Sequence, residues 1–265
     1  IGVELGTLLY KLGSRVTIVE VMDRLLPTFP DPELGNYLAS KVMKEMYGID
    51  VKVSTYVTEI DPDNGLARLS NGESLKVNKI LVAVGREPNT EGLNLEGVGV
   101  EVRNGAITVD EHSRTNVPSI YAAGDVTGKY MFASVAKVQG IIAAENAADL
   151  NTRIDYSLIP MVVFSDPEIA SVGPIVSRDD PRYIVTKMPN VINYRVIAYN
   201  KPYGWVKIIA ERGSKKIIGF HMIGPWASEL INMAVIAIRK GEKKNEGKEG
   251  GVFDVVFFLL LIKNN

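Results

Sequence analysis

The sequence predicts an α/β domain, then a central segment, then an α+β domain with an antiparallel sheet. Three observations lead to this prediction. Residues 1–20 have the pattern of a helix, a tight glycine turn and a strand that ends in an acid. Residues 120–126 (Ile-Tyr-Ala-Ala-Gly-Asp-Val) resemble a buried strand that ends abruptly in a glycine and a carboxylate. From about Asp155 onward, short strand-like runs alternate with turns, which is typical of an antiparallel sheet with packed helices.

Composition excludes several kinds of function. The 265 residues suffice for one large or two to three small domains, and a net charge of −1 gives no indication of a nucleic-acid partner. The absence of cysteine rules out disulfides, thiolate metal sites and a cysteine nucleophile within this sequence, and we assign no metal site. The most apolar run, residues 252–262, is too short to span a membrane and contains Asp254. We therefore expect a soluble cytoplasmic protein with no leader.

The first elements predict the second half of a dinucleotide-binding βαβ unit. Residues 1–13 form one helical face and end at a glycine, and residues 16–20 follow as a strand. Gly2 stands where the last glycine of the phosphate-binding loop belongs, so we expect the sequence to begin within the motif, without its first strand. The Glu20 carboxylate suits the ribose hydroxyls of NAD and would repel the 2′-phosphate of NADP. Arg24 could clamp a phosphate, but beside Glu20 we favour a solvated or locally paired arginine.

Periodicity and turn signals predict the elements that follow. Residues 31–48 form a helix, with Pro32 in its first turn and Gly48 at its end. Strands are expected at 51–53, 57–60, 67–70, 74–77 and 79–84, with Asn71-Gly72 as a hairpin turn. After a short extended piece at 105–110 and the strand at 120–126, residues 132–150 form an Ala-rich helix whose start could face a phosphate.

Two strand ends carry candidate ligand-binding residues. Gly85 begins the run Gly-Arg-Glu-Pro-Asn and permits close backbone approach, although such a run is also often only a turn between domains. Gly124 likewise removes a side chain where a ligand could come close. The carboxylate of Asp125 suits sugar or polyol hydroxyls, and the alternative is that it only caps a turn.

The last part of the chain predicts the antiparallel sheet. Strands are expected at 161–164, 183–188, 194–198, 205–211 and 216–222, with a hairpin at 213–214 and a closing amphipathic helix at 227–240. Of the two histidines, His112 lies in a polar loop and His221 in a strand, and we expect neither to be catalytic.

Together these stretches resemble the flavin-dependent pyridine nucleotide–disulfide oxidoreductases, from residue 1 to about Gly241. The motifs that carry the resemblance are 1–6, Glu20 with 23–27, 84–89, 120–126, 140–145, 163–173 with Phe-Ser-Asp-Pro-Glu at 164–168, and 219–225. The resemblance implies an NAD-binding domain at 1–84 without its first strand and a central segment completing the FAD site at 85–151. It further implies an interface (dimerisation) domain at 152–241, followed by a divergent tail at 242–265.

The resemblance also implies roles for particular residues. Asp125 would bind the FAD ribityl chain beside Gly124, and the flavin region would be contacted by Met131, Phe132, Ala133 and Ser134. The NAD site would be lined by Gly2, Glu20, Val57 and Gly85, with Glu4 near the nicotinamide. Each of these residues has a structural alternative, and Val57 especially suits an ordinary core position.

The sequence departs from the family in three places. The N-terminal FAD domain with its cysteine pair is missing, and Ser134 stands where relatives commonly have histidine. After Gly241 the family's C-terminal His-Pro segment, whose histidine is the acid–base partner of the thiol, is absent. No catalytic residue can therefore be assigned, beyond a positioning role for Glu4.

The expected function is FAD-dependent electron transfer between NAD(H) and a disulfide, in the NAD-using lipoamide branch of the family, by a chain that is inactive alone. The resemblance implies a homodimer and possible membership of a 2-oxoacid dehydrogenase complex. Two alternatives stay open: a non-catalytic fragment or split subunit with a nucleotide-binding or assembly role, and an enzyme like glutathione or mercuric reductase.

Overall fold

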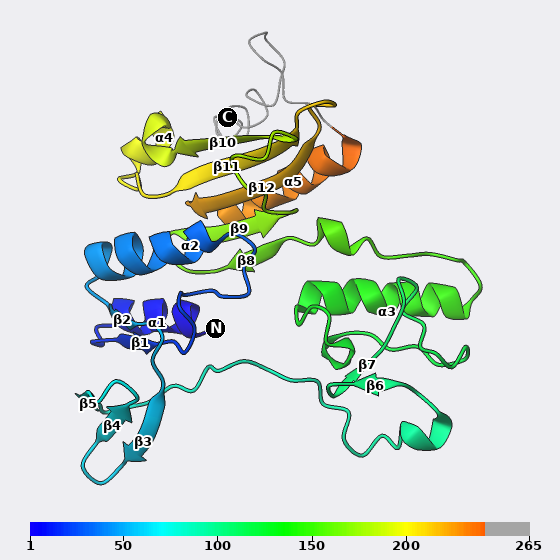
Figure 1. Cartoon of the computed structure of the whole chain (residues 1–265), viewed down its shortest axis with the longest axis horizontal. Helices are drawn as coiled ribbons and strands as arrows, with labels where there is room; N and C mark the ends of the chain where they lie inside the picture. The colour runs from blue at the N-terminus through cyan, green and yellow to red at the C-terminus, as the bar shows by residue number, and fades with distance from the viewer. Residues whose placement is uncertain (242–265) are drawn as a thin grey trace. The chain divides into compact units, whose positions relative to one another are not determined.

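The computed structural model describes residues 1–241, which form two compact units (Figure 1). The first unit joins Ile1–Ala83 to the part of the chain that begins at Pro160. The second unit is Val84–Ile159. The first unit therefore combines an α/β beginning with an antiparallel sheet, and the second holds the Gly124-Asp125 turn.

The first unit opens with the predicted helix and strand. Helix α1 (Gly2–Lys11) packs on β1 (Thr17–Val19), because a Cβ on Gly6 would lie 3.5 Å from the Ile18 side chain. Strand β1 pairs in parallel with β2 (Asp50–Lys52). Between the two strands, α2 (Pro32–Tyr37) continues as the π-helical segment η1 (Leu38–Met46) and stops before Gly48, whose φ is +67°. The buried side of this helix carries Leu34, Leu38, Val42 and Met43.

A small antiparallel sheet follows, with strand order β3-β4-β5. Strand β3 (Val57–Asp61) pairs with β4 (Leu66–Leu69), which pairs with β5 (Ser74–Lys76). Gly72 in the connecting turn has φ +89°, a conformation that glycine adopts readily, so the Asn71-Gly72 hairpin is confirmed. Val57 is 38% exposed, so the alternative that it is a core residue is wrong.

The predicted strand at 79–84 is not a strand. No backbone N–H of this stretch bonds to another described backbone group, and Val82 is 70% exposed. A parallel strand needs a neighbour with free edge groups. Within residues 1–241, β1 pairs with β2 alone, and no other strand lies beside 79–84 to complete a ladder. An apolar run thus indicates the capacity to form a buried strand, but pairing depends on a partner.

The remaining part of the first unit is a five-stranded antiparallel sheet with strand order β10-β11-β12-β9-β8. Its strands are β8 (Met161–Val163), β9 (Glu168–Val172), β10 (Tyr183–Pro189), β11 (Trp205–Glu211) and β12 (Ile217–Gly224). Helix α5 (Ala227–Lys240) covers one face, where Val206, Ile208 and Phe220 pack against Ile231. The other face packs on the α2 and η1 helices through Trp205 and Ile223.

One predicted strand of this region is a helix instead. Tyr194–Ala198 forms α4, preceded by the short turn η5 (Asn190–Ile192). The side chain of Asn193 caps α4 by accepting a hydrogen bond from the Arg195 backbone N–H at 3.0 Å. This cap stabilises the first turn, and the alternation of Tyr, Val and Ala that favoured a strand is overridden.

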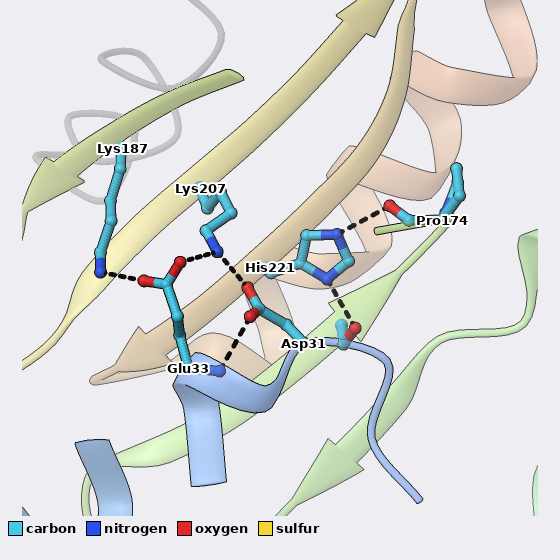
Figure 2. A network of polar contacts seen from close by, with 7 residues as sticks. Asp31, Glu33, Pro174, Lys187, Lys207 and His221 are labelled. Atoms are coloured by element: carbon cyan, nitrogen blue, oxygen red, sulfur yellow. Dashed lines mark hydrogen bonds and ion pairs between the residues drawn. The ribbon is translucent and has the colours of Figure 1, made fainter. Parts of the chain in front are cut away.

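A row of polar side chains crosses the face of the sheet that receives α2. Lys187, Lys207, His221 and Ser171 are register partners on β10, β11, β12 and β9. Figure 2 shows the ammonium of Lys207 between the carboxylates of Asp31 and Glu33, with Glu33 also reaching Lys187. His221 donates a hydrogen bond from Nε2 to the Pro174 carbonyl (3.2 Å), so in the neutral ring Nδ1 accepts a hydrogen bond from the Ser171 hydroxyl (2.7 Å). His221 is fully buried with both ring nitrogens hydrogen-bonded, which supports the prediction of a structural role.

The second unit contains little regular structure before its helix. A short turn, η2 (Glu96–Val98), precedes the two-residue strands β6 (Val102–Arg103) and β7 (Ala106–Ile107). Residues 120–123 form only an isolated bridge, Tyr121 to Arg114, with two backbone hydrogen bonds to residues 113–115, so the predicted strand there is wrong because this pairing is too short to form a ladder. The turn η3 (Asp125–Thr127), helix α3 (Ala133–Ala147) and turn η4 (Tyr156–Leu158) complete the unit.

Two kinds of feature are absent from residues 1–241. None of the described helices is long and apolar enough to cross a membrane. No group of three or more His, Cys, Asp or Glu side chains in that part of the chain is placed to hold a metal ion. The apolar run at 252–262 lies outside the described residues.

Candidate cofactor-binding sites

The Gly124-Asp125 turn is the best-defined candidate site of the second unit. Gly124 is buried and has φ +85° and ψ −156°, a conformation that is essentially restricted to glycine. A Cβ at this position would lie 3.3 Å from the Cβ of Ala136. The turn therefore requires glycine both for its backbone conformation and for its contact with α3.

The carboxylate of Asp125 begins η3 and remains 40% exposed. Its Oδ2 lies 3.5 Å from Nε of Arg86, whose side chain is 64% exposed. An accessible carboxylate beside an accessible guanidinium offers acceptors for hydroxyls and a donor fork for phosphate oxygens. This donor and acceptor set fits the polyol chain and phosphates of a flavin nucleotide. Arg86 belongs to one of the sequence motifs, but the sequence predicted no role for it.

The residues expected near the flavin stand at the start of α3. Phe132 is the N-cap residue, and its side chain cannot accept a hydrogen bond from the backbone N–H groups of the first turn. Ala133 and Ser134 are exposed, and Met131 and Phe132 are partly buried. The structure brings this stretch and the Gly124-Asp125 turn into one unit, and Gly124 contacts α3 directly through Ala136.

A buried amide lies beneath the turn and was not predicted. Gln139 of α3 is fully buried, and its Oε1 accepts a hydrogen bond from the Gly124 N–H at 2.7 Å. Its Nε2 donates to the Tyr156 hydroxyl at 2.8 Å. Burial raises the pKa of Tyr156, so this hydroxyl keeps its proton at neutral pH. The sequence held one signal: Gln139 and Asn146 lie seven residues apart on a mostly apolar helix, and so share one face.

The candidate nucleotide residues of the first unit lie at α1 and β1. Gly2 begins α1, where an added Cβ would be in ordinary contact with Ala83 at 3.5 Å. Glu4, in the first turn, accepts a hydrogen bond from the Phe164 N–H at 2.9 Å. Glu20 follows β1 directly, and its Oε1 accepts from the Met22 N–H at 2.9 Å. This bond occupies one carboxylate oxygen and leaves the other with acceptor capacity for a ribose hydroxyl.

The remaining predictions for this site have different outcomes. Arg24 pairs with Asp23 at 3.2 Å and donates to the Pro27 carbonyl at 3.1 Å, so the prediction of a locally paired arginine is confirmed. Gly85 has φ +116°, and a Cβ added there would have nothing within 4 Å, but this glycine belongs to the second unit. Gly2, Glu20 and Val57 belong to the first unit, so their grouping with Gly85 in one site stays a prediction.

Two family descriptions match the chain. Residues 1–140 match the pyridine nucleotide-disulphide oxidoreductase family, and residues 159–249 match the dimerisation domain of that family. The chain is 37% identical over 244 residues to a dihydrolipoyl dehydrogenase of Chlamydia muridarum, covering 90% of this chain and 52% of the relative. It is 35% identical over 248 residues to a dihydrolipoyl dehydrogenase of Bacillus subtilis, covering 89% and 52%. The chain thus spans about half the length of these relatives.

Solved structures give the same picture. The crystal structure of LpdA from Mycobacterium tuberculosis superposes with a TM-score of 0.83 at 28% identity, over 98% of this chain and 59% of that one. The flavoprotein disulfide reductase RclA from Escherichia coli, in its Cu(II) complex, has the same fold, with a TM-score of 0.82 at 24% identity over 99% and 62%. Motifs, fold and family matches agree, and the chain belongs to the pyridine nucleotide–disulphide oxidoreductase family.

Proposed function

We propose that this chain supplies the NAD-binding part, the segment that completes the FAD site and the dimerisation part of an FAD-dependent NAD(H):disulfide oxidoreductase, specifically a dihydrolipoamide dehydrogenase. The observation that carries the proposal is the Gly124-Asp125 turn, in which a glycine-only backbone presents an accessible carboxylate beside Arg86. The names of the relatives, at 35–37% identity over nine-tenths of the chain, support the choice of substrate.

The family's cofactors are FAD and NAD(H). When bound, FAD passes electrons between the nicotinamide and a disulfide. In our proposal Asp125 accepts hydrogen bonds from the ribityl hydroxyls of FAD. The stretch Met131 to Ser134 contacts the flavin region at the start of α3.

The proposed NAD site uses residues from the beginning of the chain. Glu20 accepts the hydrogen bonds of the adenosine ribose hydroxyls and disfavours a 2′-phosphate. Gly2 lets the backbone approach the pyrophosphate, and Val57 and Gly85 line the site. Glu4 positions the nicotinamide, and its bond from the Phe164 N–H holds the carboxylate in one orientation.

The acid–base and thiol chemistry would come from outside the described residues. The sequence has no cysteine, and of its two histidines His221 is fully buried with both ring nitrogens hydrogen-bonded. His112 is held by a bond of its Nδ1 to the Thr152 carbonyl at 2.7 Å. A disulfide from another segment or subunit would therefore complete the reaction.

We also propose that the protein acts as a homodimer through the region matched by the family dimerisation domain. If dihydrolipoamide is the substrate, the expected partner is a 2-oxoacid dehydrogenase complex.

Intact mass and the visible spectrum of the purified protein test the proposal first. The expected result is flavin absorbance that NADH bleaches anaerobically, and in steady-state assays with NADH as the electron donor, lipoamide should be preferred over glutathione disulfide and Hg²⁺ as the electron acceptor. A mass close to the 29.0 kDa of this sequence with no flavin absorbance, even after incubation with FAD, would contradict the proposal for this molecule and favour a non-catalytic fragment.

A further inference from the structure

The amide of Gln139 is the point at which helix α3 holds the Gly124-Asp125 turn. Its Oε1 is the only acceptor that the Gly124 N–H has among the described residues. The Gly124 carbonyl is satisfied separately, by the backbone N–H of Thr127 at 3.0 Å and its hydroxyl at 2.8 Å. Both backbone polar groups of this buried glycine are therefore fixed, and one of the two depends on a single distant side chain.

The other end of the same amide is anchored as firmly. Its Nε2 donates to the Tyr156 hydroxyl at 2.8 Å and lies 3.4 Å from Oγ1 of Thr127. Tyr156 is stacked on Tyr130 with ring centroids 5.9 Å apart, and the ammonium of Lys129 lies 4.4 Å from its ring. The amide can neither rotate nor retreat without breaking these contacts, so Oε1 stays aimed at Gly124.

We infer that Gln139 is a positioning residue: it holds Gly124 in its glycine-only conformation and thereby fixes the direction in which the Asp125 carboxylate is presented. The inference rests on the proposed function in one respect, the assignment of that carboxylate to a flavin polyol chain. Gln139 does not touch the ligand, because it is fully buried beneath the turn. It acts through the backbone of Gly124.

Asn146 provides a matched control on the same helix. It is 2% exposed, lies on the same face seven residues on, and its Nδ2 donates to the carbonyls of His112, Ile142 and Thr152. Loss of either amide leaves buried polar groups without partners and lowers stability. Only the loss of Gln139 releases the Gly124 N–H.

The test compares Gln139→Leu, Asn146→Leu and Gln139→Glu. Glutamate keeps an acceptor toward Gly124, and the Tyr156 hydroxyl can turn to donate to it. Three quantities are measured. The first two are the melting temperature and the rate of hydrogen exchange at the Gly124 amide relative to amides within α3. The third is the dissociation constant of FAD, measured on the form of the protein that binds FAD. Both leucine variants should melt lower. Gln139→Leu alone should speed Gly124 exchange and weaken FAD binding, each by about tenfold, and Gln139→Glu should restore both.

Equal relative exchange at Gly124 in the two leucine variants would overturn the inference. Unchanged FAD affinity in a folded Gln139→Leu variant, when the unsubstituted protein binds FAD, would overturn it as well and leave the proposed function intact. If no form binds FAD and only Gln139→Leu releases the Gly124 amide, the positioning role stands and the proposed function fails.

Discussion

The side-chain nitrogen of Lys207 lies 2.5 Å from Oδ2 of Asp31, and the two side chains are only 8% and 1% exposed. The pair joins β11 of the antiparallel sheet to the residue that caps α2, since Asp31 also accepts the Glu33 N–H at 3.0 Å. Burial tends to raise the pKa of Glu33, but the ammonium groups of Lys187 and Lys207 outweigh burial and lower it. Segments more than 170 residues apart are thus held by one compact set of charges.

Removing the ammonium should destabilise the first unit strongly. Lys207→Met keeps the aliphatic length but leaves the buried Asp31 carboxylate without its partner, which costs about 3–5 kcal/mol in comparable cases. Lys201→Met is the matched control, because Lys201 is 50% exposed and lies 3.8 Å from Asp166. It should cost less than about 1 kcal/mol. The measurement is the free energy of unfolding from urea titrations.

Neutralising the orphaned carboxylate should reverse part of that loss. In the double variant, Asp31→Asn keeps a side-chain oxygen for the Glu33 N–H and removes the buried charge. Its unfolding free energy should exceed that of Lys207→Met. Strict additivity of the two single changes would contradict a direct ion pair.

The free energy of unfolding should fall as the pH is lowered, because His221 is buried in its neutral form. Burial, the largest effect, lowers the pKa of His221 to about 4, from 6.5 in the unfolded chain; Asp31 raises this pKa and Lys207 lowers it further. Between pH 6.5 and 4 the unfolded chain binds the proton and the folded protein does not. The contribution of neutral His221 to the free energy of unfolding is therefore complete above pH 6.5. It is lost as pH falls toward 4, with a slope of up to about 1.4 kcal/mol per pH unit.

The His221→Gln variant tests this prediction through the pH dependence of its unfolding free energy. His221→Gln lowers stability at every pH but should flatten the dependence of the unfolding free energy on pH between 6.5 and 5. The pKa of Glu33, the carboxylate that binds both lysines, is lowered from 4.5, so its titration lies below that range. An unchanged slope in the variant would show that another group carries the effect.

Elements defined by local signals could be predicted from the sequence, and elements that need a distant partner could not. The Asn71-Gly72 hairpin and the helix that begins at Pro32 depend on turn and cap chemistry within a few residues. The runs at 79–84 and 120–123 have the composition of buried strands. Among the described residues the first finds no neighbouring strand, and the second pairs with residues 113–115 through one isolated bridge. Residues 194–198 form a helix in place of the predicted strand, because a single cap by Asn193 outweighs a short alternating pattern.

The residues of the candidate site also differ in whether local sequence patterns could predict them. Gly124 and Asp125 were predictable because a glycine and a carboxylate at the end of an apolar run are adjacent in sequence. The partners Arg86 and Gln139 were not assigned roles, because their contacts with the turn span 39 and 15 residues. No local pattern specifies such contacts.

Glu20 should set the choice of pyridine nucleotide. Glu20→Ala removes the proposed acceptor of the ribose hydroxyls and the charge that repels a 2′-phosphate. NADH affinity should fall by about tenfold or more, as expected for loss of a hydrogen bond to a charged group, and NADPH affinity should rise. Glu59→Ala is the control, because Glu59 pairs with Arg68 on the surface of the small sheet. Equal losses for NADH and NADPH would contradict the role of Glu20.

Two glycines of the second unit should respond to alanine in opposite directions. Gly124→Ala places a Cβ on a backbone with φ +85° and 3.3 Å from Ala136, and strain of this kind costs about 1–3 kcal/mol. Gly140 lies on the exposed side of α3 with nothing within 4 Å of an added Cβ. Gly140→Ala should stabilise the helix by about 0.5–1 kcal/mol, since alanine loses less backbone entropy on folding. Thermal unfolding gives both signs, and flavin absorbance after incubation with FAD should drop in the Gly124 variant alone. If both variants shifted the melting temperature in the same direction, the backbone of Gly124 would not require glycine, and the argument for its role in cofactor binding would fail.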